Sequence, residues 1–307
     1  MGSEQQFVIP AEVIGGFDSG DDTTREWLRL LPSVARDLLQ KWDLRPDGMV
    51  RAGEAGVLVP VRRADGTPAA LKLQPPKPET SAAILGLIAW SGRGTVLLLD
   101  SDTDAGGMLL ERLHEDRSLE AVDDDDDAVH VVGGLLTRLH DAPAPDGLPR
   151  LGAIVAQMIG DAPAAMRVLE ADDRSRMDRW ARQVAEVETE AGDRLLHWDL
   201  HYGNVLSADR EPWLAIDPEP LVGHPAFDLW PALDSEWSTD HSVSDAPRIV
   251  RRRFDILTEM LALDRHHAAA WTAARLLQNA LWDIEDGHHV ISALAKTVDD
   301  ALASFSG

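Results

Sequence analysis

The pattern of apolar positions changes its period along the first part of the chain. In TTREWLRLLPSVARDLLQKW, residues 23–42, apolar side chains recur every three or four positions, which is typical of a helix with one buried face. Because proline is favoured in the first turn of a helix, we expect Pro32 to begin a second helix here. The next segment, MVRAGEAGVLVPVRRADGTPAALKLQP, alternates instead and predicts three short strands, at residues 49–52, 57–62 and 69–74.

Further along, the pattern predicts a small mixed lobe followed by a mostly helical one. ETSAAILGLIAW predicts a helix at residues 79–90, and TVLLLD and GMLLERL predict two more strands. Five strands with one inserted helix define an N-terminal lobe of residues 1–113. Residues 114–307 are expected to be mainly helical, with short strands flanking residues 197–217. The predicted fold class is α+β, with a small antiparallel sheet in the first lobe.

An acidic run, DDDDD at residues 123–127, stands just before a helical stretch. Val129, Val132, Leu136 and Leu139 follow it and fall on one helical face. Acidic side chains at a helix N-terminus interact favourably with the helix dipole. We therefore interpret the run as a charged helix start and assign it no ligand.

Composition and charge restrict the partners. The 29 basic and 53 acidic residues give a net charge of −24, and a field of that sign repels phosphate backbones, so we expect no nucleic-acid partner. The chain has no cysteine, which excludes disulfides and thiolate metal sites. It has neither a long apolar run nor a secretory signal pattern, so we expect a cytoplasmic protein without membrane contact. A monomer is the working expectation.

The segment HWDLHYGNVLSADREPWLAIDPEP carries the first candidate chemistry. Asp199, Asn204 and Asp217 supply carboxylate and amide oxygens, which suit Mg²⁺ better than zinc. Alone, an aspartate often caps a helix and an asparagine often lies in a turn. Together, with Asp217 after the strand-like WLAI, the three residues favour metal-assisted chemistry on a hydroxyl group.

A second candidate group lies in the N-terminal lobe. Lys72 alternates with two leucines on a predicted strand, so its side chain leaves the opposite face. Gly53 and Gly56 form a turn whose backbone N–H groups can approach phosphates, and Glu79 begins the next helix, where it can pair with Lys72. Simpler interpretations exist, since Lys72 can be a surface lysine and Glu79 a first-turn acid.

The order of these features resembles that of the protein-kinase-like phosphotransferases. HWDLHYGNVL is similar to the catalytic loop of the aminoglycoside phosphotransferases and AIDPEP to their metal-binding segment, while most of the chain resembles the streptomycin 6-kinase branch of that family. The resemblance implies a two-lobed kinase-like fold, with ATP and Mg²⁺ as cofactors and the 6-hydroxyl of streptomycin as acceptor.

The resemblance also implies residue roles. Asp199 would orient the acceptor hydroxyl and accept its proton, while Asn204 and Asp217 would bind magnesium. The implied nucleotide contacts are Lys72 on the α- and β-phosphates with Glu79 as its partner, Gly53 and Gly56 in the phosphate loop, and the backbone from Glu111 to Leu113 on adenine. The chain departs from the protein-kinase pattern in Trp198 and in DPEP, which replaces Asp-Phe-Gly.

The acceptor site is predicted from the helix ARLLQNALWDIEDG, whose acidic last turn opposes the helix dipole. Such a departure from the usual charge preference at a helix end points to function. The alternative is that these acids form a solvated helix end before Gly287. Streptomycin carries two guanidinium groups, which pair with carboxylates. The candidate contacts are Asp228, Asp234, Trp282, Asp283, Glu285 and Asp286, with Trp230 and Trp237 as further stacking partners. Asp228 has a second interpretation, that of stabilising the catalytic loop.

Three histidines, His197, His201 and His224, lie close in sequence without a zinc-type partner set, so we expect them to be buried and hydrogen-bonded. His197 is expected to brace the catalytic loop. Two alternative functions stay open: the same chemistry on another small hydroxylated molecule, and a non-catalytic nucleotide- or drug-binding protein. The intact set of Lys72, Asp199, Asn204 and Asp217 argues against the second.

Overall fold

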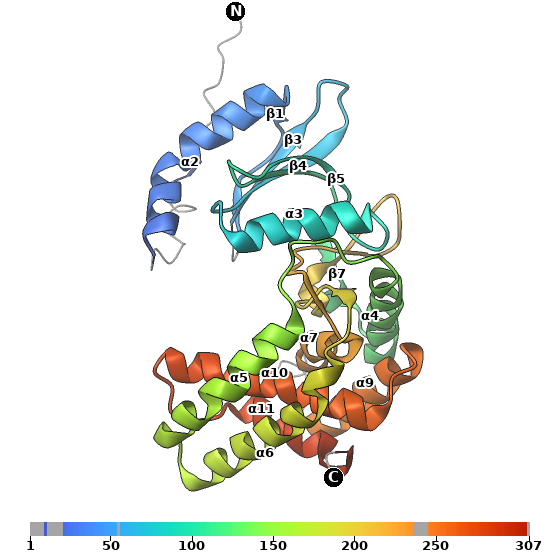
Figure 1. The fold of residues 1–307 in the computed structure, drawn as a ribbon. Coiled ribbons are helices and arrows are strands. Elements are labelled where there is room, and N and C mark those ends of the chain that lie inside the picture. Colours follow the sequence, from blue (N-terminus) through green and yellow to red (C-terminus); the bar gives the residue numbers. More distant parts are fainter. Residues whose placement is uncertain (1–8, 11–20, 54–55, 236–244, 306–307) are drawn as a thin grey trace, which may run out of the picture. The chain divides into compact units, whose positions relative to one another are not determined.

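The computed structural model of this chain describes residues 9–10, 21–53, 56–235 and 245–305. The chain divides into two compact units, Met1–Leu113 and His114–Gly307 (Figure 1). An antiparallel sheet dominates the first unit and helices dominate the second, so the predicted α+β class is confirmed.

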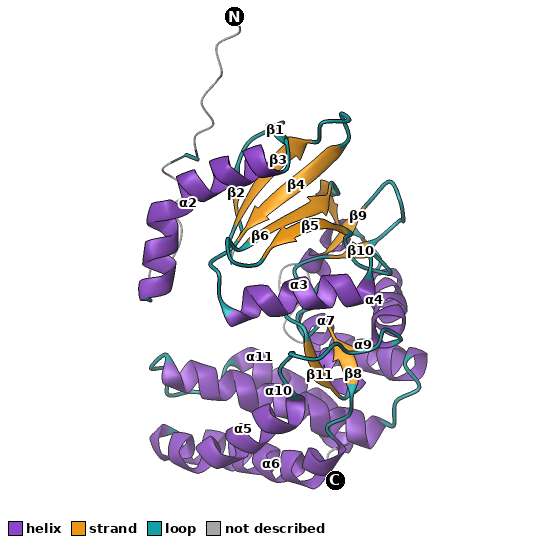
Figure 2. Ribbon diagram, turned by 45° about the horizontal axis from the view of Figure 1, so that its top comes forward, coloured by secondary structure: helices purple, strands orange, loops and turns teal. Residues whose placement is uncertain are grey.

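A six-stranded antiparallel sheet forms the centre of the first unit (Figure 2). Its strands run in the order β1-β3-β4-β6-β5, and β2 pairs with β3 on the same edge as β1. Their bounds are β1 Arg45–Pro46, β2 Arg51–Ala52, β3 Val57–Arg62, β4 Pro68–Leu73, β5 Leu98–Asp102 and β6 Gly107–Glu111. The predicted count of five strands is wrong, because the two residues of β1 are too few to show an alternating pattern.

Helix α2 (Asp22–Lys41) covers one face of this sheet. Its N-cap Asp21 accepts a hydrogen bond from the Thr24 backbone N–H (2.9 Å). The prediction that Pro32 begins a second helix is wrong, because α2 continues through it. Residues on both sides of Pro32, such as Trp27 and Leu38, belong to one buried cluster with strand residues, and this shared packing outweighs the backbone hydrogen bond that proline removes.

The second unit is built from helices with two small sheets. Its helices are α4 Asp125–His140, α5 Leu151–Ala165, α6 Ala171–Val187, α7 Trp230–Asp234, α9 Ala246–Met260, α10 Arg265–Glu285 and α11 Ala293–Leu302. The sheets are β7–β9–β10 and β8–β11, from β7 His114–Ser118, β8 Arg194–Leu196, β9 Val205–Ser207, β10 Leu214–Ala215 and β11 Leu221–Gly223. The short strands expected around residues 197–217 are therefore confirmed.

The acidic run begins α4, as predicted, and the apolar face that follows it is buried. Asp124 is the N-cap and accepts from the Asp127 backbone N–H (3.1 Å). The run does more than start a helix, because Asp125 and Asp126 form ion pairs with Arg253 and Arg252 of α9. Two of the five acids thus connect α4 to α9.

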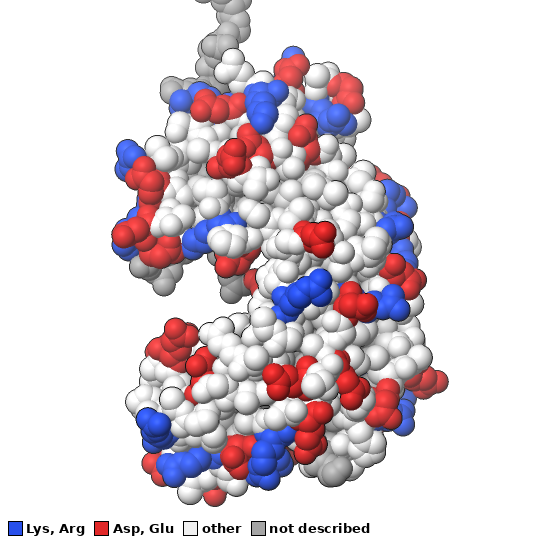
Figure 3. Space-filling view, in the orientation of Figure 1, with Lys and Arg blue, Asp and Glu red and all other residues white. Residues whose placement is uncertain are grey.

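Acidic and basic side chains are interspersed over the face of the molecule shown in Figure 3. No helix in the described part of the chain combines the length and the apolar character needed to cross a membrane.

Candidate active site

The predicted catalytic loop follows β8 and ends in a short 3-10 turn, η4 (Tyr202–Asn204), within the second unit. The side-chain amide of Asn204 donates to Oδ2 of Asp199 (3.0 Å) and to the Asp199 backbone carbonyl (2.9 Å). Because its nitrogen is directed at Asp199, the amide oxygen of Asn204 is the atom that can accept a hydrogen bond or bind a metal.

Asp217 lies next to Asn204 because of a hairpin. Asn204 comes directly before β9 and Asp217 follows soon after β10, and these strands pair antiparallel with Val205 opposite Ala215. The Ile216 backbone N–H donates to the Asn204 carbonyl (2.9 Å), which extends the pairing to the site itself. The structure thus brings together all three residues that the sequence singled out in this segment.

Two residues of this region have left-handed backbone conformations. Trp198 has a φ of 68° and Asp217 a φ of 53°. For residues other than glycine this conformation costs on the order of 1 kcal/mol each, and such strain is concentrated at functional sites. At Trp198 the backbone N–H donates to Oδ1 of Asp228 (2.6 Å), which helps to hold the strained conformation.

Asp228 is a brace of the loop. Its side chain is fully buried, and its carboxylate also accepts from the His197 backbone N–H (3.0 Å) and lies 2.8 Å from Nε2 of His140. A carboxylate enclosed by these groups has no surface left for a drug. The prediction that Asp228 contacts the acceptor is therefore corrected, in favour of its alternative role in stabilising the loop.

His197 has the bracing position expected for it. Its Nε2 lies 3.1 Å from the Ile216 carbonyl, so it connects the loop to the residue before Asp217. Burial lowers the pKa of His197 to about 4, which keeps the ring neutral near pH 7. Burial also lowers the pKa of His224 to about 4. The His224 ring stacks on the ring of Trp271, with 5.5 Å between the ring centroids.

His201 differs from the prediction of a buried histidine. Its side chain is 40% exposed, and its Nε2 lies 3.9 Å from Oδ2 of Asp199. Its Nδ1 accepts from the Gly203 backbone N–H (3.1 Å), which fixes the orientation of the ring. The ring faces a pocket because the turn of the loop directs it outward.

A pocket of about 330 Å³ opens beside Asp199. It lies entirely within the second unit and is lined by Glu120, Asp199, His201, Tyr202, Trp230, Pro231, Asp234, Ser235 and Arg275. Its volume lies at the lower end of the range of small-molecule sites. The candidate base therefore lies in a pocket that can receive part of an acceptor molecule.

Asp234 is the predicted acceptor contact that lines this pocket. Burial raises the pKa of its carboxyl to about 6, an effect that electrostatic interactions with His201, Arg253 and Arg275 partly offset. Ionised Asp234 is therefore a desolvated anion, and a cation entering the pocket would gain from meeting it.

The other predicted acceptor contacts lie outside the described lining of the pocket. Trp282 is 45% exposed, with its ring 6.2 Å from that of Trp198, and Asp283, Glu285 and Asp286 form the end of α10. Their contact with a drug stays a prediction. Of the two further tryptophans, Trp230 lines the pocket and Trp237 lies outside the described residues.

Two charged residues of the pocket were missed at the level of sequence. Glu120 lies against the catalytic loop, where a Cβ at position 203 would come within 2.6 Å of its Oε1, so Gly203 permits this approach. Arg275 lies in the middle of α10 and is only 7% exposed. A single cation among apolar residues in ARLLQNAL was the available signal for Arg275.

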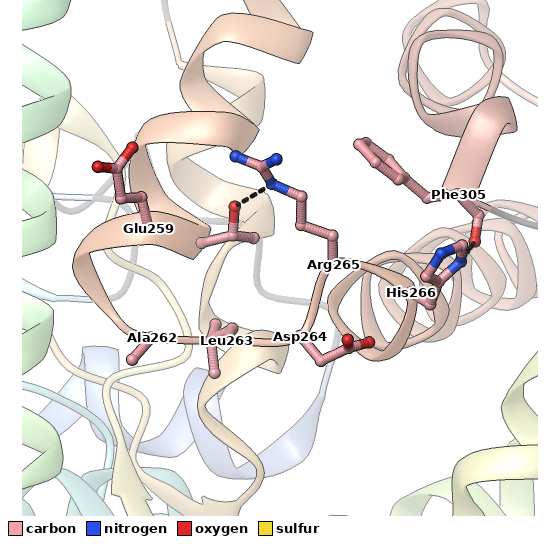
Figure 4. A pocket seen from close by; sticks show the side chains of 8 residues that line it. Glu259, Ala262, Leu263, Asp264, Arg265, His266 and Phe305 are labelled. Carbon is pink, nitrogen blue, oxygen red and sulfur yellow. Dashed lines mark hydrogen bonds between the residues drawn. The ribbon is translucent and has the colours of Figure 1, made fainter.

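A second pocket, of about 520 Å³, opens at the turn between α9 and α10 (Figure 4). Arg265 donates from Nε to the Thr258 hydroxyl (3.5 Å), and His266 contacts the Phe305 carbonyl (2.8 Å). None of the residues predicted to form the active site lines this pocket in the described part of the chain.

The predicted phosphate loop lies at the start of β3 in the first unit. The Gly53 backbone N–H donates to the Gly56 carbonyl (2.7 Å). A Cβ at Gly56 would come within 2.3 Å of the Leu73 carbonyl, so glycine is required for the approach to β4. The two residues between these glycines lie outside the described residues.

The other predicted nucleotide contacts also lie in the first unit. Lys72 lies near the end of β4, opposite Leu58 of β3 and Met108 of β6, and Glu79 lies in the first turn of α3 (Pro78–Trp90). The Glu111 backbone N–H donates to the Leu97 carbonyl (2.9 Å), and its Oε1 accepts from the Leu97 N–H (2.7 Å). Glu111 therefore holds the start of β5. Leu113 is the last residue of this unit.

The residues around Asp199 fit a magnesium ion. The Asn204 amide oxygen and the Asp217 carboxylate are hard oxygen donors, and Mg²⁺ commonly takes one or two such ligands while water and phosphate oxygens complete its shell. The described residues contain no cluster of three or more histidines, aspartates and glutamates that could hold a metal by itself.

Comparison with known proteins defines first the class and then the family. The fold is similar to a solved structure described as a putative fructosamine-3-kinase from Thermobifida fusca, with a TM-score of 0.57 and 20% identity over 89% of this chain and 98% of the other. The fold is thus of the protein-kinase-like class.

The family model for aminoglycoside/hydroxyurea antibiotic resistance kinases matches residues 41–287. The chain is 54% identical to streptomycin 6-kinase of Streptomyces griseus over 305 residues, 99% of each chain. It is 43% identical to hydroxyurea phosphotransferase of Kitasatospora aureofaciens over 303 residues, which cover 97% of this chain and 87% of the other. The chain belongs to the aminoglycoside/hydroxyurea antibiotic resistance kinase family.

Proposed function

We propose that this kinase transfers the γ-phosphoryl group of ATP to the 6-hydroxyl of streptomycin and thereby inactivates the antibiotic. The similarity to the Streptomyces griseus streptomycin 6-kinase supports this choice of acceptor. The regiochemistry, the 6-hydroxyl, rests on that similarity alone.

The observation that carries the proposal is the acidic pocket beside the candidate base. Asp199 shares its pocket with the carboxylates of Glu120 and Asp234. Streptomycin carries two guanidinium groups, and a planar guanidinium pairs with a carboxylate through two parallel hydrogen bonds. The pocket therefore offers anionic partners to the drug at the place where its hydroxyl would be phosphorylated.

The reaction needs little covalent help from the protein. The hydroxyl oxygen bonds to the γ-phosphorus while the bond from that phosphorus to the β–γ bridging oxygen breaks, and ADP leaves with the electron pair. Asp199 orients the hydroxyl and accepts its proton. Asn204 holds the Asp199 carboxylate in position through its amide N–H group. Mg²⁺, bound by Asn204 and Asp217, would neutralise charge on the nucleotide phosphates.

The nucleotide is assigned to the first unit. Lys72 would contact the α- and β-phosphates with Glu79 as its partner, and the turn from Gly53 to Gly56 would approach the phosphates with its backbone. The Leu113 backbone N–H is proposed as the donor to adenine, because the N–H of Glu111 already bonds to Leu97.

We assign the activity to a cytoplasmic monomer, since ATP and Mg²⁺ are available in the cytoplasm. Size-exclusion chromatography with light scattering tests the oligomeric state, and a stable dimer would contradict this part of the proposal.

Hydroxyurea is the second candidate acceptor, favoured by the similarity to the Kitasatospora aureofaciens enzyme. Hydroxyurea is small and uncharged, so it would leave the carboxylates of Glu120 and Asp234 without a cationic partner. The charge of the pocket therefore favours streptomycin.

Mass spectrometry tests the proposal. The protein is incubated with Mg²⁺, ATP and either streptomycin or hydroxyurea, and fragmentation locates the phosphoryl group. We expect singly phosphorylated streptomycin, no product from Asp199→Ala, and normal product from the control Asp146→Ala, which changes an exposed loop residue. Phosphorylated hydroxyurea beside unmodified streptomycin would select the second acceptor. ATP and both compounds left unchanged would favour a binding protein without turnover.

A further inference from the structure

Arg275 is a cation built into the pocket that is proposed to receive a cationic drug. Its side chain lines the pocket together with Asp199, yet the residue is only 7% exposed. It is the only lysine or arginine among the described lining residues, where it stands against the carboxylates of Glu120, Asp199 and Asp234. A cation at this position would repel the guanidinium groups of the drug, so its presence calls for a physical reason.

The Arg275 side chain is held in place from two sides. Nη1 donates to Oε1 of Gln278, one turn along the same helix (2.7 Å). The guanidinium carbon lies 5.3 Å from the ring centroid of Trp198, 5.4 Å from that of Phe227 and 5.9 Å from that of Trp282. Three aromatic rings and an amide thus fix the cation without neutralising it.

Four carboxylates, those of Asp199, Asp228, Glu219 and Asp234, act on the charge of Arg275, and Asp199 has the largest effect. Burial lowers the pKa of Arg275 to about 10, and the attraction of Asp199 is the largest effect that opposes this decrease. The guanidinium is therefore still charged near pH 7. Burying a cation is costly, and an apolar side chain among these aromatic rings would avoid that cost. The cost indicates a function beyond packing.

The function that we infer concerns which group of the drug, a guanidinium or a hydroxyl, binds at Asp199. An ionised carboxylate in a pocket for a cationic drug binds a guanidinium more strongly than a neutral hydroxyl. A guanidinium bound at Asp199 would place the wrong group in line with the nucleotide and block the base. A fixed positive charge that lines the same pocket as Asp199 repels the guanidinium and has a much smaller effect on the hydroxyl.

We propose that Arg275 is a positioning residue that reserves Asp199 for the acceptor hydroxyl and directs the guanidinium groups of the drug to Glu120 and Asp234. This inference rests on the proposed function, because it requires a cationic acceptor. It predicts that removing the Arg275 cation improves binding of the drug and impairs its phosphorylation.

The test compares Arg275→Met with Arg275→Lys and with the wild type. Streptomycin affinity is measured by calorimetry without nucleotide, and kcat is measured with Mg²⁺ and ATP. We expect Arg275→Met to bind streptomycin about threefold more tightly or better and to lose about 100-fold in kcat. Arg275→Lys should recover most of that kcat. A residue that merely supports the pocket would behave in the opposite way, with weaker binding and unchanged kcat at saturation, and that result would overturn the proposal.

A second measurement does not depend on the folding of Arg275→Met. Because Arg275 already offsets the charge of Asp199, Asp199→Asn should change the Kd for streptomycin by less than about twofold, whereas Asp234→Asn should raise it by about tenfold or more. Equal weakening by both variants would overturn the inference and leave the proposed function intact if the wild type phosphorylates streptomycin. A wild type that leaves streptomycin unmodified would overturn the proposed function, and this inference with it.

Discussion

Asn204 and Asp199 form one structural unit, in which the amide of Asn204 donates to both the side chain and the backbone carbonyl of Asp199 (3.0 and 2.9 Å). The candidate base and a candidate magnesium ligand are thus positioned by the same two hydrogen bonds. A change at Asn204 therefore affects both the orientation of the base and the binding of the metal.

Asn204→Ala should reduce kcat by about 100-fold and raise the Mg²⁺ concentration needed for half-maximal activity by about tenfold. The variant loses the amide oxygen proposed for the metal as well as the N–H group that orients Asp199. Steady-state kinetics over a Mg²⁺ titration measures both effects. The only other asparagine of the chain provides the matched control, and Asn279→Ala should change neither value by more than about twofold. An unchanged Mg²⁺ requirement in Asn204→Ala would remove Asn204 from the metal site.

Asp228→Asn should destabilise the protein by about 2–4 kcal/mol, since the amide keeps one oxygen acceptor but directs its N–H₂ group at the other of the two backbone N–H groups, of His197 or Trp198. Urea denaturation of the second unit measures the change in the free energy of unfolding. The exposed control Asp146→Asn should stay within about 0.5 kcal/mol of the wild type. Equal stabilities for the two variants would contradict the bracing role of Asp228.

The raised pKa of Asp234 predicts how the stability of the protein changes with pH. Burial raises its pKa from 3.8 to about 6, so the folded protein holds this proton more readily than the unfolded chain. The ionised carboxyl therefore destabilises the fold above about pH 6, and this penalty disappears as the pH falls below about 4. Asp234→Asn removes the penalty and should raise stability by about 1–3 kcal/mol near pH 7.5, with little change near pH 4. Thermal unfolding of both proteins across this range is the measurement, and a pH-independent difference would contradict it.

The same proton also competes with the drug for Asp234. Streptomycin affinity should therefore decrease as the pH falls below about 6, and Asp234→Asn should lose most of this dependence. Calorimetric titrations near pH 5 and pH 7.5 compare the two proteins. A decrease of equal size in the variant would assign the pH dependence to another group.

The ion pair between Asp125 and Arg253 predicts that part of the acidic run contributes to the stability of the fold. Its carboxylate pairs with Arg253, which is 2% exposed and also donates to the Ala232 carbonyl (2.9 Å) near the end of α7. Asp125→Asn leaves this buried cation less compensated and should cost about 2–4 kcal/mol in stability. Asp123→Asn, an exposed change within the same run, should cost less than about 0.5 kcal/mol. Chemical denaturation of the pair distinguishes the two positions.

The fold was predictable where an element is long enough to show its period. Helix α4 is 16 residues long, and its buried residues include all four that the pattern selects. Strands β3 and β4 occupy the predicted positions to within one residue. The two-residue strand β1 shows no period and was missed. Pro32 is another local signal that failed, because packing on both sides of it keeps α2 continuous.

By itself, the sequence determined the group formed by Asp199, Asn204 and Asp217, because these residues lie on one loop and one short hairpin, where spacing along the chain fixes spacing in three dimensions. Only the tertiary structure decided what surrounds them. Glu120 and Arg275 come from distant parts of the chain and line one pocket with Asp199. Glu120 is brought there by the contact of η1 (Leu119–Ala121) with η4, and Arg275 by α10, which packs against η5 (Pro225–Asp228). The role of Asp228 in stabilising the loop likewise depends on its burial beside the backbone N–H groups of the loop. A charge acquires its role from the neighbours and the solvent around it, and those depend on the whole fold.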